Sequence, residues 1–178
     1  MTKIADNPWK VPVRIDEIPE SGKKIELEAD ATIRATLARL ANINGLPRLH
    51  ASFDLTRHKR DGVHVVGRVT ATADQTCIVT LEPITNEVDE AIDLVFAPGD
   101  QRPEKEIVAS AEDEDPPELI LNGVVDLGAI AAEFLVLGID PYPRKSDAVF
   151  ERPVEDESAE NPFAALAALK KSDPSPGT

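Results

Sequence analysis

The chain has 178 residues, which is enough for one domain with a substantial core and additional tails. It carries 19 Lys and Arg residues against 33 Asp and Glu residues, a formal net charge of −14. This balance argues against a histone-like nucleic-acid binder or a polybasic membrane anchor, because both need net positive charge. The single cysteine, Cys77, excludes an intramolecular disulfide framework and fits a reducing compartment. The sequence has no apolar run of the ~18 residues that a membrane span needs and no apolar segment after Met1 of the signal-peptide type, so we expect a soluble cytoplasmic protein without a membrane partner.

The charge is distributed unevenly along the chain. Residues 31–80 hold 7 basic and 3 acidic side chains, whereas residues 81–178 hold 7 basic and 23 acidic ones. Two acidic runs, at 112–118 and 155–160, are too charged to bury, so we interpret them as solvated spacers or as segments that dock on a basic partner.

The first half of the chain predicts three strands and one helix before a hairpin turn. Alternating apolar residues indicate a short edge strand over 11–15 and a second strand over 24–28. Asp30 is a suitable N-cap for a helix over about 31–44, which Gly45 and Pro47 would end. Ser52–Thr56 then predicts a strand that leads into a turn over 57–62.

The clearest strand follows this turn, with five small apolar residues on one face: Val63, Val65, Val69, Ala71 and Ala73. We expect an interruption near Gln75–Cys77 and a further strand over about 87–96, with Val88, Ile92, Leu94 and Phe96 on its buried face.

The second half predicts a mobile acidic loop over about 99–118, a short strand over 119–123 and a second helix capped by Asp126. The apolar stripe of that helix is predicted to contain Leu127, Ile130, Ala131, Phe134 and Leu137. Beyond an acidic tail, Asn161 and Pro162 predict a short helix over about 162–171, whose apolar face carries Phe163, Leu166 and Leu169.

These elements predict an α+β fold, a mainly antiparallel sheet covered by two helices. We expect a single domain over residues 10–147 and an acidic tail over 148–178 that contains the terminal helix. We predict that the tail helix docks on a partner through Phe163, Leu166 and Leu169, with packing on the chain's own core as the alternative.

The sequence contains no phosphate-binding glycine loop, no nucleophile elbow and no zinc-hydrolase motif. His50, His58 and His64 lack the spacing of metal ligands, and a lone Cys77 is more often packed than reactive. The remaining carboxylates on ordered elements, Asp74, Glu82 and Asp126, are scattered. We therefore predict no catalytic residue, no metal site and no cofactor.

One concentration of positive charge remains, on and beside the predicted hairpin. This cluster lies within twelve residues and consists of Arg57, His58, Lys59, Arg60 and Arg68. Phosphate binding favours such a projecting basic element, although charged hairpin tips also serve solubility and no aromatic residue is interleaved here for base stacking. RNA contact and a solvated turn both remain open.

Four separated stretches resemble the YceD family, a bacterial and plastid group first known as a domain of unknown function. They are the central signature over 69–83, the stretch 125–135, the sequence Asp140-Pro141-Tyr142-Pro143 and the terminal stretch 161–166. The central signature of this chain contains the family residues Gln75, Cys77, Leu81, Glu82 and Pro83. Its form is similar to the signature of the alphaproteobacterial branch of the family.

Many family members carry C-x-x-C in the central signature, but here Thr80 stands in place of the second thiol. A single thiolate cannot chelate zinc as a pair would, which leaves a metal role unsupported. A redox or regulatory Cys77 would need a thiol pKa well below ~8.5.

The resemblance implies a role in accumulation of large-subunit (23S) ribosomal RNA, without an assigned enzymatic activity. We therefore expect a non-enzymatic ribosome-biogenesis factor that binds large-subunit rRNA or a basic ribosomal or assembly protein. The alternatives are a metal-dependent enzyme acting on RNA and an acidic protein–protein adaptor unrelated to RNA.

Overall fold

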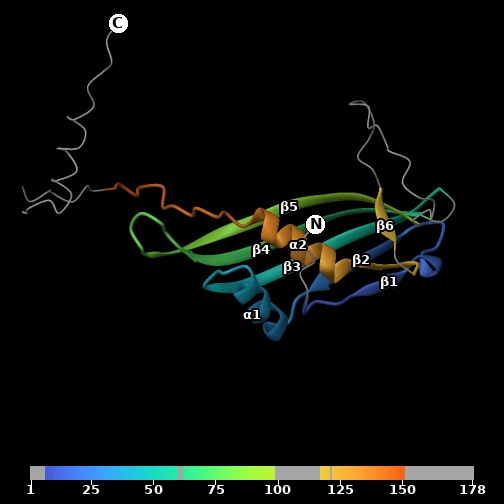
Figure 1. The fold of residues 1–178 in the computed structure, drawn as a ribbon, viewed down its shortest axis with the longest axis horizontal. Helices are drawn as coiled ribbons and strands as arrows, with labels where there is room; N and C mark the ends of the chain where they lie inside the picture. The colour runs from blue at the N-terminus through green and yellow to red at the C-terminus, as the bar shows by residue number, and fades with distance from the viewer. Residues whose placement is uncertain (1–6, 60–61, 99–116, 121, 151–178) are drawn as a thin grey trace, which may run out of the picture. The chain divides into compact units, whose positions relative to one another are not determined.

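The computed structural model describes residues 7–59, 62–98, 117–120 and 122–150. The backbone divides into two compact units, Met1–Ala148 and Val149–Thr178. All the helices and strands described below belong to the first unit (Figure 1). No helix among the described residues is long and apolar enough to cross a membrane.

The α+β prediction is confirmed. A five-stranded sheet has the order β2-β3-β4-β5-β6, and its first four strands are antiparallel neighbours. The strands are β2 (Lys23–Glu28), β3 (Gly45–His58), β4 (Gly62–Thr76), β5 (Pro83–Pro98) and β6 (Glu118–Ile120), the last of which runs parallel to β5. A separate two-stranded sheet pairs β1 (Pro12–Arg14) with β7 (Val124–Asp126), and a 3-10 turn, η1 (Ile15–Glu17), follows β1.

Helix α1 (Ala31–Leu40) begins as predicted, because the Asp30 side chain accepts a 2.8 Å hydrogen bond from the Ile33 N–H. It ends before residue 44, however. Asn42 adopts φ 54°, in the left-handed region, and the Ile43 N–H returns to the Ala38 carbonyl oxygen. Such a C-terminal turn satisfies the last carbonyls and releases the chain into β3.

Strands β3, β4 and β5 are longer than the sequence indicates. β3 already starts at Gly45, and β4 continues through Gln75 to Thr76, so the interruption predicted near Gln75–Cys77 begins only at Cys77. The alternation over 63–73 is confirmed, since all five predicted apolar residues are fully buried. Pairing with β5 in unbroken register keeps Gln75 within the ladder, opposite Ile84.

The strand predicted over 119–123 is correct only for its first two residues. β6 ends at Ile120, and Asn122 and Gly123 turn with φ values of 57° and 68° before β7 starts. Positive φ is tolerated best by Gly and Asn, and this turn moves the chain from the large sheet to the small one. Most of the predicted acidic loop, residues 99–116, lies outside the described residues.

Helix α2 (Leu127–Gly138) is capped as predicted, because Asp126 accepts from the N–H groups of Gly128 and Ala129. Its predicted stripe is correct at Leu127, Ile130 and Ala131, which are buried, and at Phe134, which packs partly buried against the core. Leu137 is the exception, with 71% of its surface exposed, whereas Leu135 is fully buried. Two residues correspond to about 200° around a helix, so these two leucines point in opposite directions.

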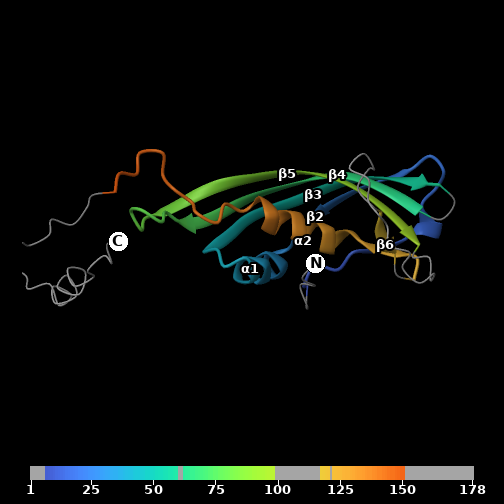
Figure 2. The same cartoon turned by 45° about the horizontal axis from the view of Figure 1, so that its top comes forward.

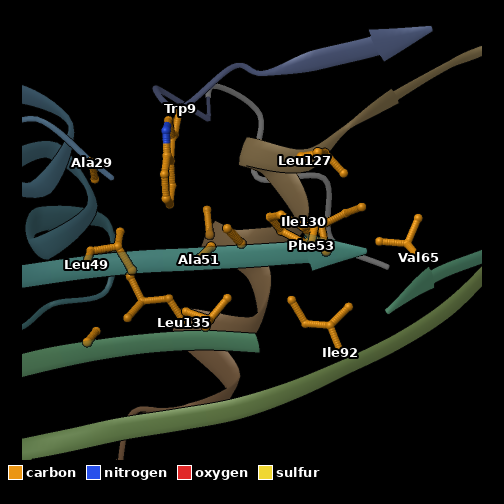
Figure 3. Packing of buried hydrophobic residues seen from close by; sticks show 14 of the residues in the cluster. Trp9, Ala29, Leu49, Ala51, Phe53, Val65, Ile92, Leu127, Ile130 and Leu135 are labelled. Carbon is orange, nitrogen blue, oxygen red and sulfur yellow. The ribbon is translucent and has the colours of Figure 1, made fainter. Parts of the chain in front are cut away.

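Both helices lie on one side of the large sheet (Figure 2). The core fills the space between them, where Phe53 and Ala51 of β3 face Leu135 and Ile130 of α2, and Trp9 closes one side (Figure 3). A Cβ atom on Gly128 would lie 2.2 Å from the Trp9 carbonyl oxygen, so glycine is needed for this close approach. We call the side of β2–β5 that faces away from the helices the open face.

Candidate functional site

The predicted signature residues lie together, at and beside the loop that joins β4 to β5. Two backbone hydrogen bonds close this loop: the Cys77 N–H donates to the Glu82 carbonyl oxygen at 2.8 Å, and the Leu81 N–H donates to the Cys77 carbonyl oxygen at 2.9 Å. Leu81 adopts φ 59°, which is unfavourable for a residue with a Cβ atom. We call residues 77–82 the signature loop.

The signature loop holds the segment that follows α2. The Ile78 N–H donates to the Pro143 carbonyl oxygen at 2.9 Å, and Lys145 forms an ion pair with Glu82. Gln75 is the one buried polar side chain among the described residues; it donates to the Asp140 carbonyl oxygen and accepts from the Asn86 side chain, both at 2.8 Å. Both polar ends of Gln75 are therefore satisfied, and two sequence signatures 65 residues apart meet here.

Cys77 is fully buried at the centre of this junction. Its sulfur accepts hydrogen bonds from the backbone N–H groups of Thr80, at 3.5 Å, and Lys145, at 3.4 Å. Hydrogen bonding from the Thr80 side chain, followed by these backbone donors, lowers the pKa of the Cys77 thiol to about 6. Among the described residues, no group of three His, Cys, Asp or Glu side chains is placed to hold a metal ion.

Apolar side chains at this end of the sheet are left in solvent. Ile78 is 48% exposed, Leu81 76% and Tyr142 70%. Pro143, by contrast, is buried where the loop holds it. The junction therefore combines a fixed hydrogen-bonded frame with an apolar surface.

The predicted basic cluster is divided between the two sides of the sheet. Arg57 pairs in register with the buried Val63, and its Nε donates to the Ile18 carbonyl oxygen at 2.8 Å. Arg68 lies on the open face and pairs with Asp89. His58 and Lys59 lie at the end of the hairpin, where Lys59 has φ 52°, and Arg60 is outside the described residues.

The open face itself is acidic. Its charged positions comprise three cations, Lys24, Arg48 and Arg68, and seven anions, Glu26, Glu28, Asp54, Asp74, Glu87, Asp89 and Asp93. All three cations are in ion pairs, with Asp54, Glu87 and Asp89 respectively. Two histidines of the face also contact carboxylates: His50 contacts Glu26 at 2.7 Å and His64 contacts Asp93 at 2.6 Å.

The three scattered carboxylates on ordered elements, Asp74, Glu82 and Asp126, each have a structural partner. Glu82 pairs with Lys145, Asp126 caps α2, and Asp74 accepts a 2.8 Å hydrogen bond from Thr85. The structure does not bring these three together. The predicted docking residues Phe163, Leu166 and Leu169 lie outside the described residues.

Comparison with known proteins identifies the family. The family model described as large ribosomal RNA subunit accumulation protein YceD matches residues 65–170. The chain belongs to the YceD family. No curated protein and no solved structure matches it.

The YceD match begins in β4 and includes the signature loop, β5, α2 and the segment held by Cys77 and Gln75. It leaves β1, β2, α1 and β3 outside. The family description connects this protein with accumulation of the large ribosomal RNA subunit and names no reaction.

Sequence reasoning missed two parts of the site. Lys145 and Asn86 contact the signature residues Cys77, Glu82 and Gln75, but neither stands in a recognisable pattern. The row of carboxylates along β5 did have a signal, because Glu87, Asp89 and Asp93 all stand at odd-numbered positions of the predicted strand, although Glu90 interrupts the apolar residues between them.

Proposed function

We propose that this YceD-family protein supports accumulation of large-subunit rRNA without catalysing a reaction, by binding a basic ribosomal or assembly protein on its open face. The observation that carries the proposal is the charge of that face, with seven anionic positions against three cationic ones. Such a surface attracts a cationic partner and repels a phosphate backbone.

The pairing of the cations strengthens this argument. Arg48 contacts Glu87, and Arg68 contacts Asp89, so each of these ion pairs is neutral as a unit, and the seven anions against three cations leave the face with a surplus of negative charge. Arg57 is held by the Ile18 carbonyl oxygen. The net charge of −14 adds long-range repulsion of RNA.

The test is crosslinking and capture of the tagged full chain from growing cells, with the proteins identified and the RNA sequenced together. The first variant combines Glu87→Gln, Asp89→Asn and Asp93→Asn. Its matched control combines Glu17→Gln, Glu20→Gln and Glu133→Gln, three exposed carboxylates away from the open face with the same change in net charge.

We expect basic ribosomal proteins to be recovered with the wild-type and control proteins, and their recovery to fall about tenfold with the open-face variant. Direct 23S rRNA crosslinks to residues 57–60, reduced by Arg57→Ala with Lys59→Ala and Arg60→Ala, would instead support RNA binding by the hairpin. Equal recovery by both acidic variants would refute the proposed partner class.

A further inference from the structure

Among the residues that the structure describes, one side of strand β5 is mostly unpaired. The strand pairs with β4 from Pro83 to Phe96, but on its other side β6 covers only Phe96–Pro98. Figure 1 shows β5 at the border of the sheet, with β6 beside one end. In the part of the chain that the structure describes, no other strand pairs with β5.

The register identifies which backbone groups point outward. The Cys77 N–H donates to the Glu82 carbonyl oxygen, so these two residues form a hydrogen-bonded pair. Hydrogen-bonded pairs alternate along an antiparallel ladder, so the even-numbered residues of β5 bond to β4. The outward N–H and C=O groups of the uncovered stretch belong to Thr85, Glu87, Asp89, Ala91, Asp93 and Val95.

These same residues have their side chains on the open face. Among the described residues, no other segment forms a hydrogen bond with the outward backbone N–H and C=O groups of these six residues. The free edge is therefore a row of unused backbone groups beside a row of three carboxylates, Glu87, Asp89 and Asp93, which contact Arg48, Arg68 and His64 of the open face. Unpaired edges of this length bind an added strand unless a protein protects them.

We infer that the outer edge of β5 between Thr85 and Val95 binds an extended basic segment of the partner protein as an added strand. This inference rests on the proposed function and specifies the binding mode of the partner, which is strand addition. Main-chain hydrogen bonds supply affinity in strand addition, and side chains at alternate positions supply specificity. Lys or Arg at every second position of the added strand would lie beside Glu87, Asp89 and Asp93.

The charge of the β5 edge favours an extended basic segment over the β5 edge of a second copy of the chain. Pairing two β5 edges would place two rows of carboxylates next to each other, and like charges across strands are destabilising. The uncovered stretch Thr85–Val95 has a length of roughly 37 Å at about 3.4 Å per residue, so it fits a segment of about ten residues.

Ala91→Pro tests the edge directly. The Ala91 N–H points away from β4, so proline removes an outward donor without removing a ladder hydrogen bond, and edge strands tolerate proline. Ala91→Ser is the matched control. The probe is a capped nine-residue peptide of alternating Lys and Thr, with binding measured by fluorescence anisotropy.

We expect Ala91→Pro to weaken peptide binding about tenfold and Ala91→Ser to change it less than about twofold. With the wild-type protein, N-methylation of one alternate set of peptide nitrogens should abolish binding, and methylation of the other set should leave it. Amide exchange at Glu87, Asp89, Ala91 and Asp93 should slow when the peptide binds. Equal binding by both methylated peptides would overturn the inference even if the proline variant does not fold.

The capture experiment separates the two proposals. If the open-face variant loses the basic partner and Ala91→Pro keeps it, the acidic face is a binding surface and strand addition is wrong. If the open-face variant keeps the partner, the proposed function itself fails.

Discussion

The backbone N–H of Lys145 donates to the sulfur of Cys77 at 3.4 Å, across 68 residues of chain. This bond joins the loop between β4 and β5 to the segment after α2. Neighbouring contacts from Gln75 and Ile78 make the same connection. The central signature of this YceD-family chain thus acts first as a structural junction, and its exposed apolar residues are displayed from a fixed frame.

Gln75 is the polar centre of this junction. Gln75→Ala should lower the free energy of unfolding by about 1–3 kcal/mol, because the Asp140 carbonyl oxygen and the Asn86 amide lose their partner. Urea unfolding measures this difference. Thr56→Ala, at an exposed strand position, is the control and should stay within about 0.5 kcal/mol of wild type. An effect no larger than that of the control would show that water replaces both contacts.

Cys77 should make stability depend on pH. Its pKa is lowered in the folded protein to about 6, from an ordinary value of 9.0. A lowered pKa stabilises the folded state fully above the unfolded pKa, and this contribution is lost as pH falls towards 6. The difference in unfolding free energy between wild type and Cys77→Ser should therefore grow from pH 6 to pH 9. A difference that is constant across this range would refute a thiolate in the junction.

Arg57 should matter for stability. Arg57→Ala removes the 2.8 Å bond to the Ile18 carbonyl oxygen and should destabilise the fold by roughly 1–2 kcal/mol. Lys59→Ala, two residues along the same hairpin, should change stability by less than about 0.5 kcal/mol. Thermal and urea unfolding compare the two. If the Arg57→Ala and Lys59→Ala proteins had equal free energies of unfolding, the Arg57 side chain would be available to bind RNA.

Leu81 carries backbone strain at an exposed position. Leu81→Asn should raise the free energy of unfolding by about 0.5–1 kcal/mol, because Asn adopts positive φ more readily and little burial is lost. Urea unfolding of this variant beside Ile78→Asn separates relief of strain from loss of apolar surface. A destabilised Leu81→Asn protein would indicate that Leu81 packs against the chain.

Gly128 allows the N-terminal segment to approach α2. Gly128→Ala should destabilise the protein by roughly 1–3 kcal/mol, since the new Cβ would lie 2.2 Å from the Trp9 carbonyl oxygen. Trp9 is the only tryptophan, so its fluorescence reports the displacement directly. Glu133→Ala, on the exposed side of the same helix, should leave both the emission and the stability unchanged.

Local patterns were sufficient for much of the fold. Asp30 and Asp126 predicted both helix starts, because a cap acts on N–H groups two or three residues away. The alternation over 63–73 predicted the buried face of β4, because successive strand residues point to opposite sides. The family signature was also readable, and the match over residues 65–170 confirms the family.

The tertiary structure decided what depends on distant parts of the chain. It buried Leu135 and exposed Leu137, which are equally apolar, because the orientation of α2 is set by the sheet beneath it. It separated Arg57 from Arg68, eleven residues apart, by placing them on opposite sides of the sheet, and it gave each a different partner. It also left the outer side of β5 between Thr85 and Val95 without a strand partner among the residues that the structure describes. Charge and periodicity are properties of neighbours in sequence, whereas pairing and burial depend on which segments meet in space.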